Sequence, residues 1–156
     1  IAYFSQALDL AIQVRDVYNQ MRAHFGLGLA HLAALQPQQA EQAFQRGQFL
    51  ALQLHIPSEQ LEAYAGLAEV ALFNGQIDRA LEYFAQAKEL EIDPESEEYG
   101  RLQRLEAKLA LAQGDHERAV ELLQRSAHLF AQLQDFPEAR RTHNLLSELL
   151  PAERER

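Results

Sequence analysis

The stretch GQIDRALEYFAQAKEL, residues 75–90, decides the fold, because two variants of it occur elsewhere in the chain. They are GDHERAVELLQRSAHLF at 114–130 and the looser QPQQAEQAFQRGQFLALQ at 36–53. When the three are aligned, Phe44 and Phe84 are 40 residues apart and Leu123 follows after 39, while Phe4 precedes Phe44 by 40. The chain therefore repeats with a period of about 40 residues, and periods of this length indicate stacked supersecondary units.

Small residues recur with the same period. One ladder lies three positions after the aligned large residues and consists of Ala7, Gly47, Ala87 and Ser126. A second ladder consists of Gly28, Ala68, Ala107 and Ser147. A small residue is needed wherever two helix backbones approach closely, and a large apolar residue fills the space beside it. No single hairpin can bury such a face alone, so the two ladders predict stacked hairpins with a continuous core.

The spacing of apolar residues and helix breakers predicts an all-helical chain. Apolar residues recur at three and four positions between Gly and Pro breakers, which is the helical period. We expect about eight helices and no strand, at 1–14, 17–35, 37–54, 58–73, 77–92, 95–113, 115–133 and 137–150. The predicted architecture is an α-α superhelix (solenoid) of antiparallel hairpins, forming one array over 1–150. Its parts are a partial repeat 1–16, repeats 17–56, 57–94 and 95–134, a partial repeat 135–150, and a polar tail 151–156.

The repeat resembles the tetratricopeptide repeat family over nearly the whole chain. The residues that carry the resemblance are Leu67-Ala68, Asn74-Gly75, Ala80, Phe84 and Ala87, with counterparts in the neighbouring units. Two features depart from the family pattern: the period is about 40 rather than about 34 residues, and Glu106 stands where Leu is expected. Long-period variants of this kind are similar to arrays in bacterial signalling ATPases and transcription activators.

Composition excludes several classes of function. The chain has no cysteine, so neither disulfides nor thiolate metal sites contribute. Its net charge of −9 argues against nucleic acid as a partner, and it contains neither a membrane-spanning run nor a signal peptide. We expect a cytoplasmic protein, and the start at Ile1 inside a periodic run indicates a fragment of a longer one.

No motif indicates catalysis, a metal or a cofactor. The histidines lack the spacing of helical metal sites, and His24, His31 and His143 fall at positions where the family favours large packing residues. The acidic stretch EIDPESEEYG, 91–100, lacks the ligand pattern of a calcium loop. We therefore expect no enzyme activity, no metal and no cofactor.

The resemblance implies that the first helix of each hairpin lines a concave groove that binds a partner. The residues at the groove positions are Arg22, Phe25, Leu29, Glu62, Glu69, Phe73, Arg101, Arg104, Lys108, Arg141 and Asn144. The groove should be apolar near Phe25 and Leu29. A basic stripe of Arg101, Arg104 and Lys108, which share one helix face by their spacing, would suit an acidic segment of the partner. These charges could instead form ion pairs between hairpins, Glu62 with Arg101 and Glu69 with Lys108.

Two functional hypotheses follow from the groove. The first is a non-catalytic protein-interaction scaffold in a larger regulatory protein, which binds a peptide, a helix or a neighbouring domain. The second is a ligand-sensing or autoinhibitory domain that holds a small molecule inside the superhelix, which a deep apolar pocket near Phe25 and Phe73 would favour. Uncapped terminal faces, with Phe4 and Leu8 at one end and Leu146, Leu149 and Leu150 at the other, are also expected to support self-association.

Overall fold

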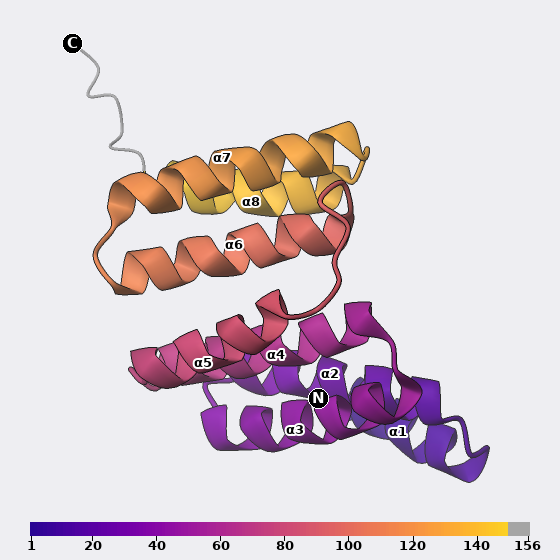
Figure 1. Ribbon diagram of the computed structural model, residues 1–156. Coiled ribbons are helices and arrows are strands. Elements are labelled where there is room, and N and C mark those ends of the chain that lie inside the picture. Colours follow the sequence, from indigo (N-terminus) through magenta and orange to yellow (C-terminus); the bar gives the residue numbers. More distant parts are fainter. Residues whose placement is uncertain (150–156) are drawn as a thin grey trace. The chain divides into compact units, whose positions relative to one another are not determined.

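The computed structural model describes residues 1–149, and all of the regular secondary structure in this range is α-helical (Figure 1). The helices are α1 (Ala2–Gln13), α2 (Val17–Ala33), α3 (Pro37–Leu54), α4 (Pro57–Phe73), α5 (Ile77–Lys88), α6 (Glu97–Ala112), α7 (His116–Gln132) and α8 (Phe136–Leu149). The prediction of an all-helical hairpin fold is confirmed. Residue 150 and the predicted polar tail 151–156 lie outside the described residues.

The largest difference from the predicted helices is at the connection between α5 and α6. Helix α5 ends at Lys88 rather than near 92, and α6 begins at Glu97 rather than at 95. Pro94 disfavours helical geometry in the residue before it. The helix therefore does not continue through Leu90 and Ile92, although both residues fit the helical period. The hydroxyl of Ser96 accepts a hydrogen bond from the backbone N–H of Tyr99 at 3.2 Å and caps α6.

Five of the helix–helix turns share one geometry. Arg15, Leu35, Gly75, Gly114 and Gln134 follow α1, α2, α4, α6 and α7, and all five have a positive φ. In each turn the next residue donates its N–H to a carbonyl five residues earlier, as Asp16 does to Ala11 at 2.9 Å. This is the Schellman arrangement, which satisfies carbonyls at the helix end.

The chain divides into two compact units, residues 1–90 with α1–α5 and residues from 91 onward with α6–α8. The single array predicted over 1–150 stays a prediction.

The first unit packs its phenylalanines against glycines. Phe44 is 1% exposed and lies between Gly28 and Gly66, where an added Cβ would come within 2.7 and 2.3 Å of its ring. The surrounding core contains Met21, Phe25, Ala40, Ala51, Ala63, Leu67 and Val70. The small residue at position 28 is therefore required by a close approach of Phe44, as the second ladder predicted.

The second unit has its own core, formed by Ala107, Ala110, Ala119, Leu122, Leu123 and Leu146. Phe130 is fully buried, and its ring would lie 2.8 Å from a Cβ added at Gly100. Ser126 is also buried and donates its hydroxyl to the carbonyl of Gly100 at 2.7 Å. The ladder residue Ser147 differs from these, because it is exposed on α8.

Candidate functional site

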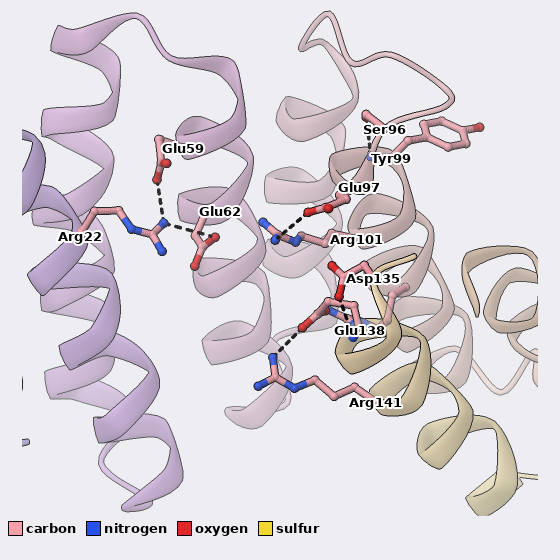
Figure 2. A network of polar contacts seen from close by, with 11 residues as sticks. Arg22, Glu59, Glu62, Ser96, Glu97, Tyr99, Arg101, Asp135, Glu138 and Arg141 are labelled. Atoms are coloured by element: carbon pink, nitrogen blue, oxygen red, sulfur yellow. Dashed lines mark hydrogen bonds and ion pairs between the residues drawn. The ribbon is translucent and has the colours of Figure 1, made fainter. Parts of the chain in front are cut away.

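An ion-pair network joins the first helices α2 and α4 of the first unit. Nη1 of Arg22 on α2 lies 3.0 Å from Oε2 of Glu59 and 3.8 Å from Oε2 of Glu62, both on α4 (Figure 2). The hydroxyl of Tyr18 donates to Oε1 of Glu59 at 3.3 Å. The side chain of Glu59 is 11% exposed and that of Arg22 is 45% exposed, so the pair links α2 to α4 while its guanidinium reaches the surface.

The local charges keep Arg22 cationic. Partial burial lowers the pKa of the Arg22 guanidinium, but the hydrogen bond that it donates to Glu59 and the charges of Glu59 and Glu62 outweigh burial and raise the pKa overall. The network is thus a charge-assisted link between neighbouring helices, which is stronger than a neutral hydrogen bond.

The second unit contains a related network between α6 and α8. Nη2 of Arg104 on α6 lies 2.6 Å from Oε2 of Glu138 on α8, and its Nη1 donates to the hydroxyl of Thr142 at 3.2 Å. Arg141 binds the other oxygen of Glu138 at 2.6 Å; Figure 2 shows this pair. Burial raises the pKa of Glu138, but the hydrogen bond and charge of Arg104 and the charge of Arg141 lower it overall.

Both networks depend on a glutamate in the first turn of a first helix. Glu59 lies in the first turn of α4 and Glu138 in the first turn of α8, and Glu98 lies in the first turn of α6. These residues are spaced by 39 and 40, so the repeat period alone could have indicated them. A carboxylate in this place is also favoured by the helix dipole.

Two residues predicted to line a groove are instead enclosed in the units. Phe25 is 1% exposed, and its ring lies 2.3 Å from where a Cβ at Gly47 would be. Arg104, at the same repeat position, has a side chain that is 17% exposed and lies over the Phe130 ring at 5.5 Å. This repeat position therefore faces the following second helix at both residues, and the prediction that it also contacts a partner stays a prediction.

The other predicted groove residues reach the surface to different extents. Leu29 on α2 is 52% exposed and Phe73 on α4 is 50% exposed. Partly exposed are Glu62, Glu69, Arg101 and Lys108, whereas Arg141 and Asn144 are fully in the exposed class.

The basic stripe predicted on α6 has fewer accessible charges than expected, because Arg104 packs within the second unit. Arg101 lies 3.8 Å from Glu97 on its own helix (Figure 2). The pairs suggested between Glu62 and Arg101 and between Glu69 and Lys108 join residues of different units and stay predictions.

Within residues 1–149 there is no group of three or more His, Asp or Glu side chains placed to hold a metal ion. Over the same residues, each helix is too short or too polar to cross a bilayer. His24, expected to be a packing residue, is half-buried; burial and the nearby charge of Arg46 lower its pKa.

Residues 59–130 match the tetratricopeptide repeat family. The matched segment contains the Ala80, Phe84 and Ala87 pattern and the Gly75 and Gly114 turns described above. This segment thus carries tetratricopeptide repeats, a family whose members generally act as non-catalytic scaffolds for protein–protein interaction. No curated protein matches the chain.

Proposed function

We propose that the chain is a protein-interaction scaffold whose α2–α4 surface binds a peptide or helix of another protein. The observation that carries this proposal is the exposure of two large apolar side chains, Leu29 and Phe73, on the first helices of the first unit. The charged network around Arg22 and Glu59 holds these helices together. Exposed apolar side chains beside fixed charges are the usual make-up of a binding surface.

The C-terminal unit suits a partner segment of negative charge. Arg101 and Lys108 remain on the accessible part of α6, while Arg104 belongs to the fold. An acidic stretch of the partner is the chemistry that these two residues would recognise. Reversing the charge at Lys108 should then weaken binding most at low salt, where exposed charges are least screened.

We further propose, from the resemblance to long-period repeats, that this scaffold is part of a larger cytoplasmic regulatory or signalling protein. The alternative of a small-molecule sensor is less well supported, because Phe25, expected to wall an apolar pocket, fills the core itself. A shallow surface for a macromolecule fits this arrangement better than an enclosed ligand site.

The test selects peptides that bind the chain and measures their affinity for surface variants. Leu29→Asp and Phe73→Asp should each weaken binding by about tenfold or more, as expected for apolar anchors. Phe49→Asp is the matched control, since Phe49 is 61% exposed but lies on the second helix α3. Equal affinity of all three variants, or a loss confined to Phe49→Asp, would refute the α2–α4 surface as the binding surface.

A further inference from the structure

The turn between α4 and α5 contains an asparagine followed by a glycine, Asn74-Gly75. Asn74 is the C-cap of α4 with φ −84° and ψ 3°, and Gly75 has a φ of +70°. Both residues are exposed, so solvent reaches the side-chain amide and the peptide bond that follows it. The other asparagines of the chain, Asn19 and Asn144, are followed by glutamine and leucine instead.

An asparagine before a glycine can be attacked by its own backbone, and asparagine is among the thermolabile residues of proteins. In this reaction the amide nitrogen of Gly75 loses its proton to solvent and forms a bond with Cγ of Asn74. The bond from Cγ to Nδ2 breaks, and the side-chain amide group leaves as ammonia. Water then opens the resulting five-membered succinimide at either carbonyl, which gives aspartate or isoaspartate. Glycine favours the attack because it has no side chain to obstruct it.

The folded turn keeps the reacting atoms apart. A ψ of 3° at Asn74 places the nitrogen of Gly75 in line with the backbone nitrogen of Asn74, and therefore turned away from the Cβ that carries Cγ. The N–H of Gly75 also donates to the carbonyl of Leu72 at 3.0 Å, and the N–H of Gln76 donates to Ala71 at 2.8 Å. The attack therefore requires the turn to open first, as local segments of folded proteins do.

The second unit contains the same turn with a different side chain. Gln113 is the C-cap of α6 with φ −87° and ψ −3°, and Gly114 has a φ of +82°. The N–H of Gly114 donates to the carbonyl of Leu111 at 3.0 Å. The side chain of Gln113 is one methylene longer than that of Asn74, so its ring would have six members and would close more slowly. This turn is therefore a matched control within the chain.

We propose that Asn74 is a site of spontaneous deamidation and isoaspartate formation, and that opening of the α4–α5 turn controls its rate. Isoaspartate adds a methylene to the backbone, so Gly75 and Gln76 no longer donate to Leu72 and Ala71 in the same geometry. Either product also places a negative charge at the C-terminal end of α4, where the helix dipole disfavours an anion. Modification therefore weakens the turn that had protected Asn74.

The test ages the full chain in mildly alkaline buffer at body temperature, beside a free peptide of residues 68–80. Trypsin releases the fragment 47–79, in which Asn74 is the single asparagine. Mass spectrometry and labelling with isoaspartyl methyltransferase measure its conversion. Two variants exchange the dipeptides of the two turns: Asn74→Gln copies the second turn into the first, and Gln113→Asn copies the first into the second.

We expect isoaspartate at Asn74 and far less conversion at Gln113. Asn74→Gln should remove the signal from 47–79, and Gln113→Asn should create one in the fragment 109–118. The folded chain should react at least about tenfold more slowly than the free peptide, because the turn is open in a minor fraction of molecules. Urea that unfolds the chain should make the two rates equal, with the peptide measured in the same urea.

Four results would overturn parts of this inference. A folded chain without product at Asn74, after many half-lives of the free peptide, would remove the site. Equal rates in the folded chain and the peptide would show that the turn gives no protection. Comparable product at Asn19 or Asn144 would show that glycine does not select the site. An unchanged urea midpoint of the purified isoaspartate form would contradict the weakened turn. Peptide binding plays no part in these measurements, so they are independent of the proposed binding surface.

Discussion

The close packing of phenylalanine on glycine can be tested with two substitutions that the repeat makes equivalent, Gly66→Ala and Gly26→Ala. At both positions an added Cβ would lie 2.3 Å from a phenylalanine ring, that of Phe44 at Gly66 and that of Phe4 at Gly26. The two sites differ in the freedom of the ring. Phe44 is held on its other side by Gly28, whereas Phe4 borders a pocket between α1 and α2.

The two substitutions should therefore change stability in opposite directions. In a helix interior, alanine is more favourable than glycine by about 1 kcal/mol, and this gain applies at both sites. At Gly66 the enclosed ring must be displaced, and overpacking of this kind costs about 1–3 kcal/mol. Because Phe44 is confined on both sides, we expect the upper part of that range and a net loss of about 1–2 kcal/mol. At Gly26 the ring of Phe4 can rotate toward the pocket, so most of the helix gain should remain.

Urea unfolding followed by far-ultraviolet circular dichroism measures both effects, with the difference taken from the midpoint at unchanged slope. We expect a lower midpoint for Gly66→Ala and an equal or higher one for Gly26→Ala. Similar destabilisation of both variants would show that Phe4 is as confined as Phe44. A stabilised Gly66→Ala would refute the argument from close packing altogether.

Three further changes test other parts of the fold. Ala80→Leu and Ala87→Leu should each lower the stability by about 1–3 kcal/mol through overpacking, because both alanines are 0% exposed. If either variant melted at the same temperature as the parent, the alignment of the repeats along their second helices would be contradicted. Glu138→Gln should be less stable than the parent near neutral pH. This difference in the free energy of unfolding should become smaller in acid, as urea unfolding at several pH values would measure. The folded pKa of Glu138 is lowered, so its carboxylate stabilises the fold above its unfolded pKa of about 4.3 and loses this effect as the pH falls through the folded pKa; a pH-independent deficit would show that Arg104 does not hold the charge. Ser96→Ala removes the cap of α6 and should cost about 1 kcal/mol, with faster amide exchange at Tyr99 as the local readout, whereas unchanged exchange would mean that the cap is not needed.

The helices and the small-residue ladders could be predicted from the sequence because they depend on periodicity. Gly28, Ala68 and Ala107 recur at the period of the hairpin, and each is buried as expected. Ser147 follows the same period but is exposed, since burial requires a neighbouring helix on that face and the ladder alone does not supply one.

The direction of individual side chains could not be predicted in the same way. Phe25 and Arg104 share a repeat position, and family analogy placed that position in the groove. Phe25 is buried in the socket that Gly47 leaves, and Arg104 lies over the ring of Phe130. Both are contacts between residues far apart in sequence. The pairing of Arg104 with Glu138 is likewise a contact between residues distant in sequence. The recurrence of glutamate at 59, 98 and 138 would have indicated the glutamate but not its arginine partner.

The repeated turn also bears on how much more stable this chain could become. Gly75 and Gly114 adopt the left-handed backbone conformation without steric cost, whereas Arg15, Leu35 and Gln134 adopt it with a Cβ. That conformation costs a non-glycine residue about 1–2 kcal/mol, part of which a glycine would give back through greater freedom in the unfolded chain. Within residues 1–149 the molecule thus carries removable conformational strain at three of these five turns, and His55 after α3 adds a fourth such site. Glycine substitutions at these sites should raise the thermal stability without changing the core or the proposed binding surfaces.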